Sequence, residues 1–172
     1  MKPVLSLDEI RVLLRKPDPK EYLPCSEVSS GIPLGSITEV TGTGKTEFLT
    51  HLLRENTDHR ALWVEEYFSV FPPALFQRGV SPEQILFVTA KKEMEWVILN
   101  ALRSQAFSMV IFDREECDSI FLRRVQLATE KAQAATIWVS SQPQNFWTSS
   151  LQLQVKRDGS KLQVETLRKR AV

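Results

Sequence analysis

The chain has 172 residues and a mass of 19.7 kDa, which suits one domain with a sizeable core. Apolar residues at 42% and charged residues at 25% are ordinary for a globular protein, and a net charge of +1 points to no class of partner. No apolar run is long enough to span a membrane, the first residues carry charge where a signal peptide needs an apolar core, and Cys25 and Cys117 lack metal or disulfide spacing, so we expect a cytoplasmic protein with no membrane segment.

The first 30 residues are predicted to lie outside the main domain. "SLDEIRVLLRK" has a capping box, Ser6 with Glu9, ahead of apolar residues at helical spacing, and therefore predicts a helix. "PDPKEYLPCSEVSSG" is rich in proline and small polar residues, which predicts an extended connector. We therefore expect an N-terminal region over 1–30 and a core domain over 31–172.

From residue 36 onward, short apolar strands alternate with amphipathic helices. The predicted strands are "SITEVT", "ALWVEE", "ILFVT", "SMVIFD" and "ATIWVSS". The predicted helices are "KTEFLTHLLREN", "FPPALFQRG", "KKEMEWVILNALRSQ" and "DSIFLRRVQLATEKAQA", the last with Asp118 as a possible N-cap. Apolar strands alternating with helices are typical of an α/β fold whose mostly parallel sheet is covered on both faces.

The C-terminal segment has a different pattern. "SLQLQVKRDGSKLQVETLRK" alternates apolar and polar residues and has Asp158-Gly159 at its centre, which predicts an antiparallel β-hairpin. Six basic residues follow position 155, against Asp158 and Glu165. Such a cluster can contact phosphate groups of DNA or nucleotide, or can simply be solvated.

Four segments, in this order, resemble RecA-like ATPases. "GIPLGSITEV" is close to the segment that leads into their first core strand, and "MVIFD" resembles their Walker B strand. "WVSSQ" is similar to the strand that ends in their glutamine sensor, and the final "RKR" to the basic motif that closes their terminal hairpin. The resemblance covers residues 29–170 and implies a RecA-like fold.

Within that group the chain is most similar to ImuA, an accessory of error-prone translesion synthesis, in "ALFQRGVSPEQILFVTAKKEMEWVILNALRSQAFSMVIFD" and "FLRRVQLATEKA". The ImuA resemblance implies RecA or an ImuB-like polymerase as partner. The segments after Asp113 and Gln142 are too short for RecA's DNA-binding loops, so we expect no strand exchange and at most weak or indirect DNA contact. The cell-division inhibitor SulA shares the fold and lacks ATPase function.

The phosphate-binding motif is shortened. A full loop, G-x-x-x-x-G-K-[ST], would begin at position 39, which is Glu39, whereas the available glycine is Gly42. A loop three residues short supplies fewer backbone amides and cannot encircle a phosphate. Gly42, Thr43, Gly44, Lys45 and Thr46 then form either a weak nucleotide site at a helix N-terminus or an ordinary strand-to-helix turn.

The remaining candidate residues depend on whether ATP and Mg²⁺ bind. The glutamate that activates water in RecA aligns with Tyr67, so Glu66 or Glu65 would have to replace it. Thr46 and Asp113 would hold Mg²⁺, and Gln142 would sense the γ-phosphate. Each of these residues also has a purely structural alternative. Asp113 could be an acid at the end of a strand that hydrogen-bonds Thr46, and Gln142 could be an ordinary loop glutamine.

Arg168 and Arg170 lie two residues apart on one face of the hairpin. In the family the corresponding pair reaches the nucleotide of a neighbouring subunit, so self-association is one expectation; contact with DNA or solvent is the other. Among six aromatic residues outside the strands we expect most in the core, with the pair in "QNFWTSS" as a protein-binding or base-stacking site. The six are Phe68, Phe71, Phe76, Trp96, Phe146 and Trp147.

Four functions follow from these patterns, of which a RecA-like DNA-binding module is the last. The first is an ImuA-like scaffold of DNA-damage tolerance, which would not be an enzyme. The second is an ATP-binding switch or weak ATPase that assembles through its C-terminal arginines. The third is a SulA-like inhibitor of cell division. The short loop favours the first.

Overall fold

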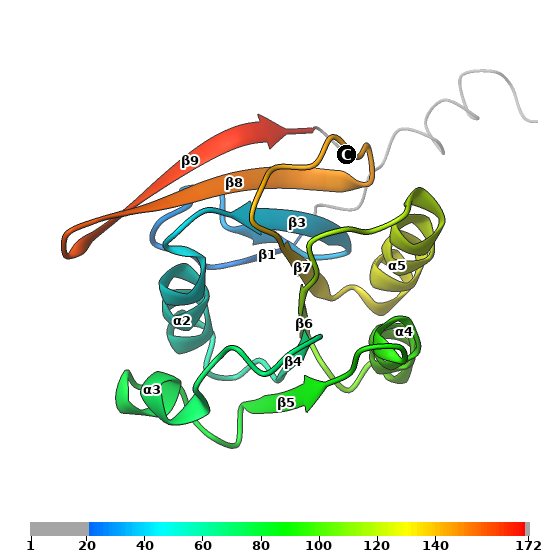
Figure 1. The fold of residues 1–172 in the computed structure, drawn as a ribbon, viewed down its shortest axis with the longest axis horizontal. Coiled ribbons are helices and arrows are strands. Elements are labelled where there is room, and N and C mark those ends of the chain that lie inside the picture. Colours follow the sequence, from blue (N-terminus) through cyan, green and yellow to red (C-terminus); the bar gives the residue numbers. More distant parts are fainter. Residues whose placement is uncertain (1–20, 171–172) are drawn as a thin grey trace, which may run out of the picture.

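A computed structural model describes residues 21–170 of the chain. The predicted helix within 6–16 lies outside the described residues. The predicted α/β class is confirmed, with a mostly parallel sheet between two layers of helices (Figure 1). No helix within 21–170 has the length and apolar content needed to span a membrane.

The main sheet has seven strands in the order β5-β4-β6-β7-β3-β8-β9. All neighbours pair in parallel except β8 and β9, which form the predicted antiparallel hairpin. The strands are β3 (Ser36–Thr41), β4 (Ala61–Glu65), β5 (Ile85–Thr89), β6 (Met109–Asp113), β7 (Ala135–Val139), β8 (Ser149–Asp158) and β9 (Lys161–Lys169). The central strands are buried along their length, as their apolar runs predict.

Helices cover both faces of this sheet. Helices α2 (Lys45–Glu55) and α3 (Pro72–Gln77) lie on one face, and α4 (Met94–Ser104) and α5 (Ser119–Ala132) on the other (Figure 1). Each pair of helices encloses its own apolar cluster against the sheet. The clusters together form a core of the size that the chain length predicts.

Helix α5 begins where the sequence indicates. The carboxylate of Asp118 accepts a hydrogen bond from the backbone N–H of Phe121 at 2.8 Å, which confirms it as the N-cap. We expect Asp118→Ala to lower the free energy of unfolding by about 1 kcal/mol, because that N–H loses its acceptor. Urea denaturation measures the change, with Ser119→Ala, at the neighbouring exposed position, as a control that leaves stability within about 0.5 kcal/mol. Equal losses in both variants would contradict the capping role.

The segment predicted as an extended connector is packed onto the domain. Strands β1 (Tyr22–Leu23) and β2 (Ile32–Pro33) pair antiparallel, and the chain between them buries Cys25 and Val28 in the α2-side cluster. Prolines and serines turn the chain here, but the segment stays packed on the domain because four of its apolar side chains are buried in the core. These are Leu23, Cys25, Val28 and Ile32. The predicted boundary after residue 30 thus falls between two strands that pair with each other.

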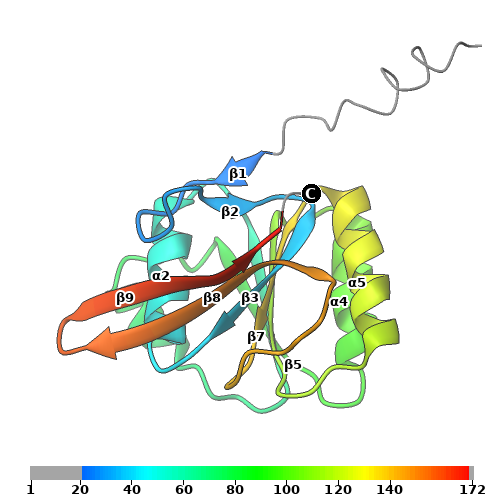
Figure 2. The ribbon, with the colours of Figure 1, turned by 90° about the horizontal axis from the view of Figure 1, so that it is seen from above.

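The β8–β9 hairpin extends beyond the rest of the sheet and runs past α2 (Figures 1 and 2). Its turn lies at the predicted Asp158-Gly159, where Gly159 adopts a φ of +59° that a glycine accepts without strain. Strand β8 is mostly buried and pairs with β3, whereas β9 is an edge with many exposed side chains. The hairpin therefore places its inner strand beside the start of α2.

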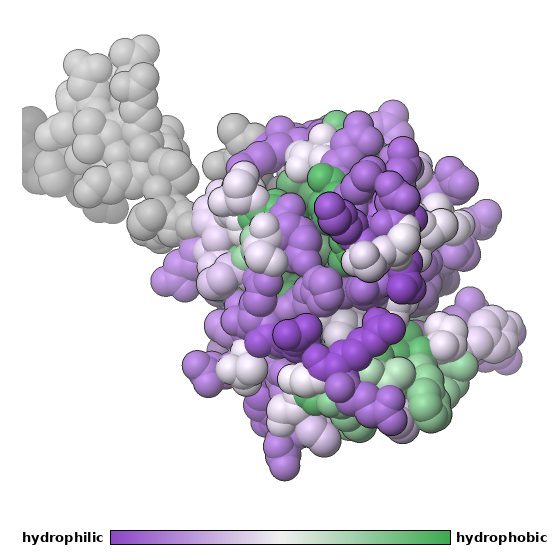
Figure 3. Space-filling model, turned by 90° about the vertical axis from the view of Figure 1, so that its left-hand side faces the viewer, coloured by the Kyte–Doolittle hydropathy of each residue, from purple (hydrophilic) through white to green (hydrophobic). Residues whose placement is uncertain are grey.

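The expectation that most of the six aromatic residues lie in the core is wrong. Phe68, Phe71, Trp96 and Trp147 are largely exposed, and Phe76 and Phe146 are partly buried. Hydrophobic residues gather at the lower right of the face in Figure 3, at the end of the molecule where Figure 1 places α3. Single apolar side chains on a surface need no explanation, but a group of them does.

Candidate functional site

The candidate site lies at the carboxyl edge of the parallel strands. From β4 the chain passes through α3 to β5, at one edge of the sheet. From the neighbouring strand β6 it passes through α5, on the opposite face, to β7, in the direction of the other edge. Crevices where adjacent strands connect in opposite directions are the usual ligand sites of open α/β sheets. A pocket of about 300 Å³ occupies this position and is lined by Lys45, Glu65, Glu66, Tyr67, Ser69, Asp113, Arg114 and Glu115.

The structure brings Lys45 and Asp113 together in this pocket. Lys45 is the first residue of α2, and its Nζ lies 3.5 Å from the carbonyl oxygen of Ser140 at the end of β7. Burial raises the pKa of Asp113, the Lys45 charge opposes that shift, and the carboxylates of Glu65 and Glu115 add to it. The two side chains therefore line the same pocket, at the carboxyl edge of the sheet.

Thr46, by contrast, is not part of this pocket. It is exposed, and within residues 21–170 it neither lines the pocket nor forms a hydrogen bond with Asp113. Asp113 therefore does not form the hydrogen bond to Thr46 that was the alternative to holding Mg²⁺. No group of three or more histidine, cysteine or acidic side chains in that range is arranged to hold a metal ion.

The two candidate glutamates have different surroundings. Glu65 is 3% exposed and accepts hydrogen bonds from Ser69 N at 2.8 Å, Ser69 Oγ at 3.0 Å and Val70 N at 3.3 Å. Its carboxylate therefore fixes the loop that follows β4. Glu66 is half-buried and also lines the pocket, so it is the better placed of the two to meet a ligand.

The glycine loop, residues 42–44, is docked on the hairpin. Gly44 N donates to the carbonyl oxygen of Val155 at 3.3 Å, and the backbone N–H of Arg157 donates to Thr43 Oγ1 at 3.4 Å. Gly42 has a φ of +99°, and a Cβ added there would lie 2.1 Å from the same Val155 oxygen. The two backbones can approach this closely only because position 42 has no side chain.

This docking changes what the loop can bind. A phosphate loop must turn its amides toward the ligand, but the Gly44 amide is used by β8. Glu47, in the first turn of α2, forms an ion pair with Arg157 (Nε–Oε2 3.5 Å), so an acid already occupies the positive end of the helix. Neither Gly42, Thr43 nor Gly44 lines the described pocket. In this arrangement the Gly44 amide is not free to meet a phosphate.

Arg168 and Arg170 hold a loop of their own chain. Arg168 Nη2 donates to Phe146 O at 2.6 Å, and Arg170 Nη1 donates to Trp147 O at 2.8 Å. Burial lowers the pKa of Arg168, as does the nearby Arg170 charge. The pair therefore fixes the loop between β7 and β8 in this chain. Gln142, in the same loop, is exposed and lies outside the pocket among the described residues.

Glu39 is a buried residue that sequence reasoning treated only as a missing glycine. It is fully buried in β3 and accepts hydrogen bonds from Gln144 N at 2.7 Å, Gln152 Nε2 at 2.5 Å and Ser140 Oγ at 3.4 Å. Burial raises the pKa of Glu39, and these donors oppose the shift. An acid inside the apolar strand "SITEVT" was the available signal. Glu39 and Arg168 therefore both hold the loop between β7 and β8.

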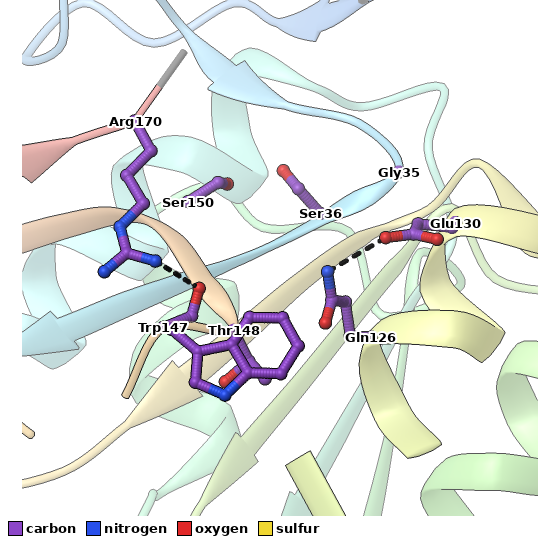
Figure 4. A pocket seen from close by; sticks show the side chains of 8 residues that line it. All are labelled: Gly35, Ser36, Gln126, Glu130, Trp147, Thr148, Ser150 and Arg170. Atoms are coloured by element: carbon purple, nitrogen blue, oxygen red, sulfur yellow. Dashed lines mark hydrogen bonds between the residues drawn. The ribbon is translucent and has the colours of Figure 1, made fainter. Parts of the chain in front are cut away.

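A second pocket, of about 170 Å³, lies at the amino-terminal ends of β3 and β8. Figure 4 shows Trp147 and Arg170 on one side and Gln126 and Glu130 of α5 on the other. Gln126 donates to Glu130 at 3.0 Å, and Arg123 lies over the Trp147 ring, 5.2 Å from its centre. Most polar groups around this pocket are therefore already paired. Of the predicted site residues, Arg170 alone lines this described pocket.

Both cysteines are free and buried, as expected for two thiols without a disulfide framework. Burial raises the pKa of Cys25 to about 12 and that of Cys117 to about 12, which keeps both as unreactive thiols.

No model of a known protein family matches the chain, and no curated protein sequence matches it.

Proposed function

We propose that this protein is a RecA-related accessory of DNA-damage tolerance, similar to ImuA, that binds RecA, an ImuB-like translesion polymerase or both. The proposal is supported by the position of the resembling segments: "GIPLGSITEV" leads into β3, "MVIFD" is β6, "WVSS" ends β7, and "RKR" closes the hairpin. The second and third segments end at the carboxyl edge of the sheet, near Lys45, whereas the first and the last meet at the amino-terminal ends of β3 and β8.

The docking of the glycine loop on β8 is the observation that favours a scaffold over an ATPase. Lys45 and Asp113 remain in the pocket, but the Gly44 amide, the close Val155 backbone and the Glu47–Arg157 pair replace the enclosure that a triphosphate needs. These contacts favour a chain that does not use Mg²⁺ and ATP as bound cofactors. The chain then acts by binding other proteins, and the fold supplies the surface.

Thermal unfolding with nucleotide tests the absence of an ATP site. We expect 1 mM Mg-ATP to leave the midpoint of the wild type unchanged within about 1 °C, and Lys45→Ala to respond in the same way. A site with a Kd near 10 μM would add about 2.7 kcal/mol at this concentration, which is roughly 5–10 °C for a domain of this size. A rise in the wild type that Lys45→Ala abolishes would instead support the ATP-binding switch.

Partner binding is tested with purified proteins. The full chain is titrated, by biolayer interferometry, against immobilised RecA and against an ImuB-like polymerase from the same organism. The proposal expects saturable binding to at least one of them in the absence of nucleotide. Binding to neither would contradict the accessory role.

A further inference from the structure

The surface that follows β4 combines exposed aromatic rings with a fixed backbone. We name residues 66–71 the aromatic loop: Tyr67, Phe68 and Phe71 are 64%, 60% and 67% exposed. Three exposed aromatic rings therefore lie within five residues of each other in the sequence. Aromatic side chains that are exposed together are typical of protein interaction sites.

The aromatic loop is held in place from beneath. The Glu65 carboxylate accepts hydrogen bonds from Ser69 and from Val70 N, and the Val70 side chain is buried in the core. The rings on either side are thereby presented outward from an ordered backbone. A pre-ordered loop loses little conformational entropy when it binds, which favours affinity.

The neighbouring pocket is acidic. Four carboxylate side chains line it against two basic ones: Glu65, Glu66, Asp113 and Glu115, with Lys45 and Arg114. This charge disfavours two occupants of the rings, even though Lys91 lies over the Tyr67 ring, with its Nζ 4.6 Å from the ring centre. Nucleic acid phosphates would be repelled, and a two-fold pairing of identical loops would place one acidic pocket beside another.

We propose that the aromatic loop and this pocket dock a protein segment that carries both basic and apolar side chains. A lysine or arginine of the segment enters the pocket toward Glu66, and its apolar neighbours cover Phe68 and Phe71. The inference rests on the proposed function, because it names the chemistry of the partner that an accessory protein would bind.

Site-specific photo-crosslinking identifies the segment. A benzoylphenylalanine replaces Phe68 in the full chain produced in its own organism, and a control places it at Ile120, an exposed apolar position on α5. Mass spectrometry of the adduct is expected to find, at position 68 alone, one partner segment with net positive charge and several apolar residues. A segment with net negative charge, a DNA adduct or a second copy of this chain would overturn the proposal.

A synthetic peptide of the crosslinked sequence then gives the affinity by calorimetry. We expect Phe68→Ala with Phe71→Ala to weaken binding at least tenfold, Glu66→Lys to weaken it and reduce its salt dependence, and Ile120→Ala to leave it unchanged. Because Phe68, Phe71 and Ile120 are exposed and Glu66 is only half-buried, all variants should unfold within a few degrees of the wild type. An unchanged affinity in the double phenylalanine variant overturns the proposal.

Two further results separate this inference from the proposed function. If RecA or the polymerase binds the double phenylalanine variant as tightly as the wild type, the accessory role stands and the docking surface is wrong. If neither binds but a basic segment of another protein does, the surface stands and the accessory role is wrong. A peptide of residues 5–16, "LSLDEIRVLLRK", is itself basic and apolar. If that peptide binds more tightly than the crosslinked peptide, the surface belongs to a segment of the chain itself and the proposal is overturned.

Discussion

Glu39→Ala is expected to lower the free energy of unfolding by about 3 kcal/mol or more. The substitution removes the acceptor of Gln144 N, Gln152 Nε2 and Ser140 Oγ, and an unsatisfied buried donor costs about 1–3 kcal/mol. Urea denaturation measures the loss, and Glu116→Ala, at an exposed acid, serves as the matched control with a change within about 0.5 kcal/mol. Hydrogen exchange of the loop between β7 and β8 should increase in the Glu39 variant.

The same residue makes stability depend on pH. Because burial raises the pKa of Glu39 in the folded state, folding favours its protonated form. Its contribution is therefore fully present below the usual pKa of a glutamate and declines as pH rises through the raised value. Glu39→Gln should remove this decline. A wild type and a Glu39→Gln variant with parallel stability curves across that range would show that Glu39 titrates normally.

Gly42→Ala is the second substitution with a large expected effect. Its Cβ would lie 2.1 Å from the Val155 carbonyl oxygen, a backbone atom that cannot rotate away, at a φ of +99°. We expect a loss of about 3 kcal/mol, from left-handed strain together with displacement of the hairpin. Unfolding by urea gives the size of the loss, and circular dichroism checks that the variant folds.

Gly159→Ala is the matched control for this substitution. Gly159 also has a positive φ, of +59°, but nothing lies within 4 Å of an added Cβ. It should therefore lose only about 1 kcal/mol, from backbone strain alone. The difference between the two variants measures the contact between the glycine loop and β8. Equal losses would mean that the loop is not docked on the hairpin.

The elements of the fold could be predicted because their signals are local. The apolar runs of β4, β6 and β7, the Asp118 cap and the Asp158-Gly159 turn each depend on neighbouring residues. The packing of residues 21–30 onto the domain could not be predicted, because their proline and serines resemble a linker. What anchors the segment is burial of Cys25 and Val28 against α2, which is a property of the assembled core.

The candidate site could be predicted only in part, for a related reason. Parallel strands end at one edge, so Lys45, Glu66 and Asp113 were expected near each other, and the pocket brings them together. The docking of Gly44 on Val155 and the binding of Arg168 to Phe146 O join residues far apart in the sequence. Spacing within a motif carries no information about such contacts. The exposure of Phe68 and Phe71 was missed because apolar residues are normally assigned to a core.

The strand order also determines when the fold can close during synthesis. Strand β3 is made first among the main-sheet strands, yet its two neighbours, β7 and β8, are contributed by residues 135–158. Both its edges therefore stay unpaired until most of the chain has left the ribosome. Such late, long-range pairing slows folding and leaves an apolar strand available to other chains. A nascent chain that stops before β7 would lack both partners of its central strand, which makes it a natural substrate for chaperones.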